Sequence, residues 1–88
     1  MISKDIIIMN STGLHARPSS MLVERAVKYK ADINIIKNKK RINAKSIMGI
    51  LASGICEGTL ITIEADGEDE KAAVDEIIEL IKCKFGEC

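Results

Sequence analysis

The sequence predicts an α+β fold, an open-faced β-sandwich in which a four-stranded, mostly antiparallel sheet carries three helices on one face. Segments with strand-like alternation and segments with helical spacing follow one another in the order βαββαβα, without an internal repeat. Each helical segment has a single apolar stripe, and such helices pack economically on one side of a sheet. The 88 residues fit one small domain, so we expect a single domain over residues 1–88.

The first strand is expected over residues 2–8. Ile2, Ile6 and Ile8 occupy alternate positions, so they point to the same face. The turn-forming run Asn-Ser-Thr-Gly at residues 10–13 ends this strand.

An amphipathic helix is expected over residues 16–28. Pro18 falls in its first turn, where the missing N–H costs nothing. Four apolar residues recur at helical spacing and form the predicted buried stripe: Leu22, Val23, Ala26 and Val27.

Two short strands are expected next, at residues 32–36 and 41–43, joined by a tight turn at residues 37–40. The turn contains Asn38 but no glycine, so we expect a residue with positive φ at some steric cost. Ser46 then precedes a short apolar helix over residues 47–52 as its N-cap.

The last strand is expected over residues 60–65 and the last helix over residues 69–82. In the strand, Ile61, Ile63 and Ala65 share one face. The helix has an acidic first turn, which favours the helix dipole. Its apolar residues at helical spacing are Ala73, Val74, Ile77, Ile78 and Ile81.

Charge is divided unevenly along a chain whose formal net charge is zero. Residues 1–59 hold ten cations against four anions, and residues 60–88 hold three cations against nine anions. A face built from the first part would favour an acidic partner. Because Tyr29 and Phe85 are the only aromatic residues, the chain has no stacking platform for single-stranded nucleic acid. We expect no nucleic-acid partner.

The sequence shows no signal peptide and no apolar run long enough to span a membrane, so we expect a cytoplasmic protein without membrane insertion. The three cysteines are odd in number and form no Cys-x-x-Cys pair, which argues against disulfides and against a zinc site. We expect Cys56 to be a buried thiol, and Cys83 and Cys88 to lie in or beyond the last helix. We expect no metal and no cofactor.

Chemistry concentrates at the start of the first helix. His15, the only histidine, directly precedes the helix, and Arg17 follows two residues later. A helix N-terminus binds anions through free N–H groups, and a guanidinium can grip a phosphate. The same positive surroundings favour a neutral, nucleophilic imidazole. A lone histidine is more often a surface or core residue, but a core histidine needs neither the arginine nor the glycine turn.

At these residues the sequence resembles the histidine-containing phosphocarrier protein (HPr) family of the bacterial phosphoenolpyruvate-dependent sugar phosphotransferase system. A second motif at residues 45–49 is similar to the family's second signature, and the length and element order also agree. The residues of the first motif are Gly13, Leu14, His15, Ala16, Arg17 and Pro18.

The resemblance implies a phosphoryl relay. Enzyme I would phosphorylate His15 at Nδ1, and His15 would pass the group to the IIA domain of a sugar permease. Arg17 and the backbone amides of Ala16 and Arg17 would stabilise the transferring charge moderately, so that the site can both accept and donate. A monomer is expected.

Ser46 has two expected roles. As an N-cap it contributes about 0.5 to 2 kcal/mol to the short helix. Resemblance to the Gram-positive members adds phosphorylation by HPr kinase/phosphorylase, with Lys45 beside the phosphate. Phosphorylation would weaken acceptance from enzyme I and favour a catabolite-control transcription regulator.

We also expect an exposed docking patch beside His15, because the short helix has more apolar positions than one buried stripe requires. Ile50 is expected in the core. The docking residues are Thr12, Ser20, Met21, Ile47, Met48 and Leu51.

Two other functions are compatible with parts of the sequence. One is a regulatory binding module that acts through phosphorylated Ser46, with His15 vestigial; retention of the whole motif around His15 argues against it. The other is a nucleic-acid-binding domain, which the scarcity of aromatic residues and the zero net charge disfavour.

Overall fold

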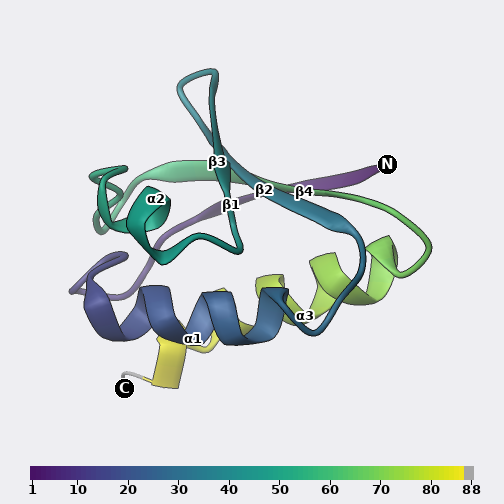
Figure 1. Ribbon diagram of the computed structural model, residues 1–88. Coiled ribbons are helices and arrows are strands. Elements are labelled where there is room, and N and C mark those ends of the chain that lie inside the picture. Colours follow the sequence, from purple (N-terminus) through teal and green to yellow (C-terminus); the bar gives the residue numbers. More distant parts are fainter. Residues whose placement is uncertain (87–88) are drawn as a thin grey trace.

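The computed structural model describes residues 1–86, so Cys88 lies outside the described residues. A four-stranded sheet forms one layer, and the helices lie on one side of it (Figure 1). The strands are β1 (Ile2–Ile7), β2 (Asp32–Lys37), β3 (Lys40–Asn43) and β4 (Leu60–Asp66). The helices are α1 (Ala16–Ala26), α2 (Ile47–Leu51), α3 (Glu70–Lys82) and the short 3₁₀ helix η1 (Lys84–Gly86).

The sheet has the strand order β1-β4-β2-β3, and all three strand pairs are antiparallel. Its registers place Ile6 opposite Ile61 and Ile33 opposite Ala65. The alternation expected from the sequence therefore produces one apolar face, as antiparallel sheets that are open on the other side require. The predicted open-faced sandwich is confirmed.

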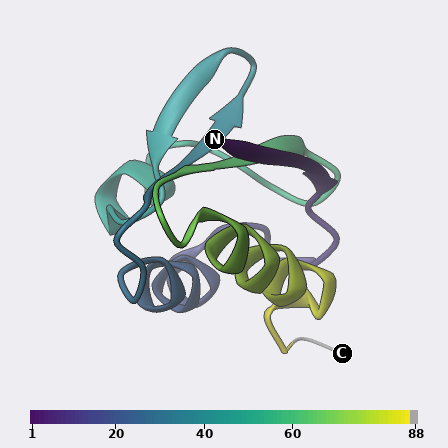
Figure 2. The same cartoon turned by 90° about the vertical axis from the view of Figure 1, so that its right-hand side faces the viewer.

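Helices α1 and α3 run side by side across the apolar face of the sheet (Figure 2). The short helix α2 packs against α1 and β3 instead. The hydrophobic core lies between these layers. Its fully buried large side chains include Ile8, Leu22, Ile33, Ile35, Ile50, Ile61, Ile63, Val74, Ile77 and Ile81.

Helix α1 ends two residues before its expected end. After Ala26 the α-helical hydrogen bonds give way to a bond between residues three apart, in which the amide of Tyr29 donates to the Ala26 carbonyl at 3.2 Å. Val27 follows the last helical residue, points away from the core and is 56% exposed. Its expected place in the buried stripe was wrong.

The end of the described chain supplies a core residue that no pattern indicated. Phe85 lies in η1 and is buried, with a positive φ of 54°. Both Phe85 and Lys84 adopt left-handed backbone angles, which fold the chain back after α3. Cys83 lies at the C-terminal end of α3 and is exposed, in agreement with its expected place.

Candidate functional site

The loop before α1 is fixed by a buried asparagine. The side-chain amide of Asn10 donates to the carbonyl of Gly13 at 2.8 Å and to the hydroxyl of Thr12 at 3.1 Å. The amide of Gly13 donates in turn to the Asn10 carbonyl at 3.1 Å. The turn is therefore held from inside, and Thr12, an expected docking residue, is exposed on it.

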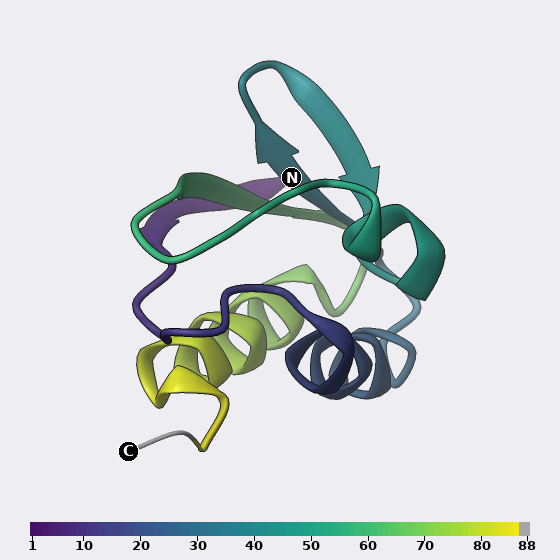
Figure 3. The same ribbon diagram turned by 90° about the vertical axis from the view of Figure 1, so that its left-hand side faces the viewer.

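A second segment, between α2 and β4, supports the same loop. The amide of Leu14 donates to the carbonyl of Ile55 at 3.1 Å. Gly13 has a φ of +60°, and a Cβ added there would stand 2.6 Å from the Cα of Cys56. Both segments cross the end of the molecule where α1 begins (Figure 3). Position 13 needs a residue that adopts a left-handed φ and has no Cβ, and only glycine satisfies both conditions.

His15 is the residue immediately before α1, with extended backbone angles and no capping bond from its side chain. Its carbonyl accepts the first bond of the helix, from the amide of Ser19 at 2.9 Å. The buried hydroxyl of Ser19 donates to the Leu14 carbonyl at 2.9 Å and ties both ends of this turn together. The imidazole is thus held at the surface on a rigid support.

The first turn of α1 leaves two backbone donors for a ligand. N–H groups at a helix start have no acceptor within the helix, and Pro18 has no N–H at all. Ala16 and Arg17 therefore present amides that no acceptor from residues 1–86 engages. The exposed side chain of Arg17 makes no ion pair within these residues. Such donors suit a phosphoryl group beside His15.

A small cavity of about 150 Å³ opens next to His15. It lies between the two residues that precede α1, the end of α2 and the segment that follows α2. Its lining residues are Leu14, His15, Leu51, Gly54, Ile55 and Cys56.

Cys56 is exposed, so its expected burial was wrong. The physical reason is local: Cys56 begins a turn in which its carbonyl accepts from the amide of Thr59 at 3.1 Å. Its thiol is 3.6 Å from the Thr59 hydroxyl. The apolar neighbour Ile55 takes the buried position instead.

Ser46 caps α2 as expected, because its hydroxyl accepts from the amide of Gly49 at 3.2 Å. The ammonium of Lys45 donates to the carbonyl of Tyr29 at 2.7 Å. That ammonium is therefore directed to the backbone and not to the Ser46 hydroxyl.

Three of the expected docking residues form an exposed apolar surface on α2. Met48 is 77% exposed, Leu51 43% and Ile47 40%, whereas Ile50 is buried as expected. Leu51 joins this surface to His15 because it also lines the small cavity.

The other two expected docking residues are neighbours on α1. Ser20 is exposed. Met21 is half-buried and lines a groove against α3, with Arg25, Glu76 and Leu80. The docking roles of all six residues stay predictions.

Ion pairs join the basic first part of the chain to its acidic last part. Glu76 on α3 pairs with Lys28 at 2.6 Å and with Arg25 at 3.6 Å. The hydrogen bond from Lys28, followed by that from Tyr29, lowers the pKa of Glu76 below its ordinary value. The same carboxylate raises the pKa of Tyr29 by accepting its hydroxyl. The excess of positive charge in residues 1–59 is therefore carried by cations that form neither of these two pairs.

Sequence reasoning missed the supports of the site, Asn10 and Ser19. A polar residue in a turn and a serine early in a helix are common, and no spacing marks them as buried. Among residues 1–86, no His, Cys, Asp or Glu residues gather in threes around a possible metal. No helix in the same range is long and apolar enough to cross a membrane.

Comparisons with known proteins agree with this geometry. Residues 2–82 match the family described as the PTS HPr component phosphorylation site. The chain belongs to the HPr family. The phosphocarrier protein HPr of Neisseria meningitidis is 40% identical over 87 residues, which span 99% of this chain and 98% of the relative.

Solved structures of HPr proteins share the whole fold. HPr from Thermoanaerobacter tengcongensis superposes with a TM-score of 0.97 at 43% identity, covering 100% of this chain and 99% of that one. Crh of Bacillus subtilis, a catabolite repression protein described as a dimer with a swapping domain, has a TM-score of 0.75 at 34% identity and covers 93% of this chain and 94% of that one. As a member of the HPr family, the chain is a phosphocarrier of the phosphotransferase system.

Proposed function

We propose that His15 is the residue that carries the phosphoryl group. The observation that carries the proposal is the position of His15, exposed and directly before the amides of Ala16 and Arg17, which no acceptor from residues 1–86 engages. In acceptance, the lone pair of Nδ1 forms a bond to phosphorus while the bond between phosphorus and the donor breaks. Donation reverses these roles with the next acceptor. No electrons are gained or lost.

Arg17 and the amides of Ala16 and Arg17 stabilise the phosphoryl group during transfer. They lie at the surface, where water screens charge, so they favour the transferring group without trapping it. This moderate stabilisation suits a carrier that must also donate.

The partners we propose are phosphorylated enzyme I as donor and IIA domains of sugar permeases as acceptors. Support comes from the exposed apolar side chains of Ile47, Met48 and Leu51, the last of which also lines the cavity at His15. Exposed apolar side chains suit the centre of a docking surface, and the exposed cation of Arg17 favours an acidic partner. We also propose that the protein is cytoplasmic and monomeric, with one HPr domain over residues 1–88. Because Crh is described as a dimer, light scattering of the purified chain tests the monomeric state.

Ser46 is proposed as a site of regulatory phosphorylation by HPr kinase/phosphorylase. The similarity to the catabolite repression protein Crh supports it, as does the position of Ser46 at the head of the exposed α2 surface. Phosphate there would add close to two negative charges and weaken docking to an acidic partner. The alternative function, binding to a catabolite-control transcription regulator through phosphorylated Ser46, rests on the same support.

Intact-mass measurement tests the carrier role. The wild type, His15→Ala and Ser46→Ala are incubated with phosphoenolpyruvate, Mg²⁺ and enzyme I. We expect one acid-labile phosphate on the wild type and on Ser46→Ala, and none on His15→Ala. A wild type that stays unmodified by a competent enzyme I contradicts the proposal.

The role of Arg17 is tested by the rates of acceptance and donation. Arg17→Lys keeps the charge but loses the planar, bidentate contact, and Arg17→Met loses both. We expect slower acceptance in both variants, with the larger loss in Arg17→Met. Equal rates in all three proteins contradict a role in transfer. Ser46 is tested separately with ATP and the kinase, where Ser46→Ala must abolish an acid-stable phosphate.

A further inference from the structure

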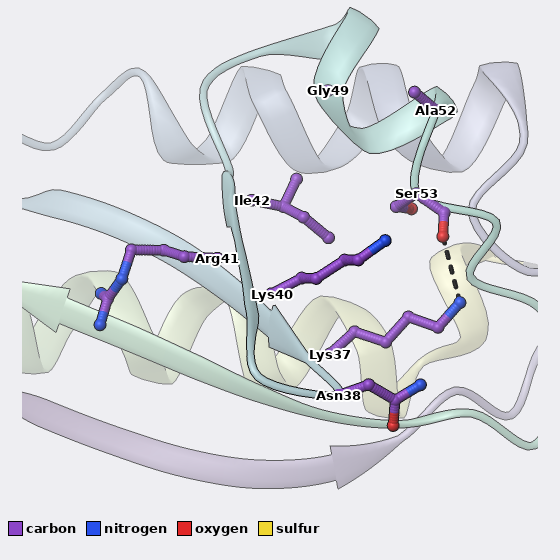
Figure 4. Close-up of a pocket in the computed structure, with 8 residues that line it drawn as sticks. All are labelled: Lys37, Asn38, Lys40, Arg41, Ile42, Gly49, Ala52 and Ser53. Atoms are coloured by element: carbon purple, nitrogen blue, oxygen red, sulfur yellow. Dashed lines mark hydrogen bonds between the residues drawn. The ribbon is translucent and has the colours of Figure 1, made fainter.

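A cavity with three cationic side chains in its lining lies away from His15. It lies between the β2–β3 hairpin and α2, and its volume is about 430 Å³ (Figure 4). Eight residues line it: Lys37, Asn38, Lys40, Arg41, Ile42, Gly49, Ala52 and Ser53. None of them is acidic.

Two ammonium groups are directed toward the same end of this pocket. Lys37 donates to the carbonyl of Ser53 at 3.1 Å. The side chain of Lys40 extends from the hairpin in the same direction (Figure 4). An ammonium has three donors, so the bond to Ser53 leaves Lys37 with two for a ligand.

These charges are not neutralised within residues 1–86. Neither Lys37 nor Lys40 forms an ion pair in this range, although other cations of the chain do. Arg41 differs, because its guanidinium points away from the pocket and pairs with Glu64. The pocket therefore contains two uncompensated positive charges.

Size and lining indicate a small ligand. A volume near 430 Å³ falls within the usual range for small-molecule sites. Ile42 and Ala52 provide apolar walls, and Asn38 and Ser53 add polar groups at the edge. Two lysines, acting as point charges, suit a phosphate dianion.

We propose that this pocket binds a small organic phosphate ester, with its phosphate between Lys37 and Lys40 and its organic part against Ile42 and Ala52. The site is separate from His15, and the proposal does not depend on the carrier role. A purely structural role for the lysines, in which they only face carbonyls at the end of α2, predicts no saturable binding.

Amide chemical shifts of the ¹⁵N-labelled full chain test the proposal. The protein is titrated at constant ionic strength with glucose 6-phosphate, with inorganic phosphate and with neutral glucose. We expect saturable shifts at Asn38, Gly49 and Ser53 with glucose 6-phosphate, weaker binding of inorganic phosphate and no response to glucose. Equal affinity for inorganic phosphate overturns the assignment to an ester.

Two neighbouring lysines provide matched variants. Lys40→Met removes a charge that lines the pocket, and we expect it to weaken binding about fivefold. Lys39→Gly removes the same charge from the adjacent turn position outside the lining, and we expect little change. Equal weakening in both variants indicates general charge attraction and overturns the site. Shifts confined to Ala16 and Arg17 overturn it as well, because they place the anion at α1.

Discussion

Gly13 and Cys56 are in backbone contact across the base of the site. A Cβ on Gly13 would lie 2.6 Å from the Cα of Cys56 and 2.8 Å from the carbonyl oxygen of Ile55. These are backbone atoms, which cannot move aside as a flexible side chain can. The loop that presents His15 is thus positioned by a segment some forty residues further along the chain.

Gly13→Ala is expected to lower the free energy of unfolding by about 2 kcal/mol or more, because it adds a steric overlap to a left-handed backbone. It is also expected to slow phosphoryl acceptance at His15. Urea unfolding and the enzyme I assay measure the two effects.

Gly58→Ala is the matched control for this prediction. Gly58 also has a positive φ, of +88°, but nothing lies within 4 Å of an added Cβ. We expect a loss of about 1 kcal/mol from backbone strain alone, with unchanged acceptance. If Gly13→Ala were no worse than Gly58→Ala, the contact with Cys56 would not matter.

The fold could be predicted because its determinants are local. Alternating isoleucines set the strand faces, and single apolar stripes set the helix faces, so element order and layers followed from periodicity. Phe85 could not be placed in this way, because its burial depends on left-handed angles at two non-glycine residues. Cys56 was misplaced because burial after Gly54 depends on the turn, not on composition.

The common place of the proposed phosphate-binding residues was also predictable, because His15, Ala16 and Arg17 are adjacent in sequence and one helix start positions them all. The contacts that hold these residues in place were not predictable. The contact of Gly13 with Cys56 and the cavity shared with Leu51 join segments far apart in the chain. No local pattern contains such contacts.

Lys39→Gly is expected to stabilise the protein. Asn38 and Lys39 have φ of 49° and 68°, so the two-residue hairpin turn has left-handed angles at both positions. Asparagine tolerates these angles and lysine does not, and a lysine at such a position costs roughly 1 to 2 kcal/mol. Because glycine gains entropy in the unfolded chain, we expect a net gain of about 0.5 to 1 kcal/mol. Thermal and urea unfolding measure this gain in stability. Lys40→Gly is the control, because Lys40 lies in a strand and glycine there should destabilise the protein. A Lys39→Gly variant less stable than the wild type contradicts the argument.

Ser46→Ala is expected to cost about 1 kcal/mol, because the amide of Gly49 loses its acceptor. Ser46→Asp restores an acceptor at the N-cap and should recover most of this stability. The same aspartate places a negative charge on the α2 surface, so it should slow acceptance from enzyme I while Ser46→Ala does not. Unfolding and acceptance measured on both variants separate the two roles; equal acceptance rates contradict the proposed regulation.

The contribution of Asp69 to stability is expected to disappear in acid. Its two carboxylate oxygens accept the amides of Lys30 and Ala31, each at 2.9 Å, and so fasten the start of α3 to the segment before β2. The bond from Lys30, with that from Ala31, lowers the pKa of Asp69 below its ordinary value of 3.8. A carboxyl group whose pKa is lower in the folded protein binds protons more readily when unfolded. Its stabilisation of the fold is therefore complete above pH 3.8 and is lost as the pH falls through the folded pKa.

Asp69→Asn should therefore be less stable than the wild type at neutral pH, and the difference in stability should shrink as the pH falls below 3.8. Urea unfolding of both proteins at a series of pH values measures this difference, with Glu68→Gln as the control for net charge. A difference that persists unchanged into strong acid would show that the carboxylate charge is not what Lys30 and Ala31 require.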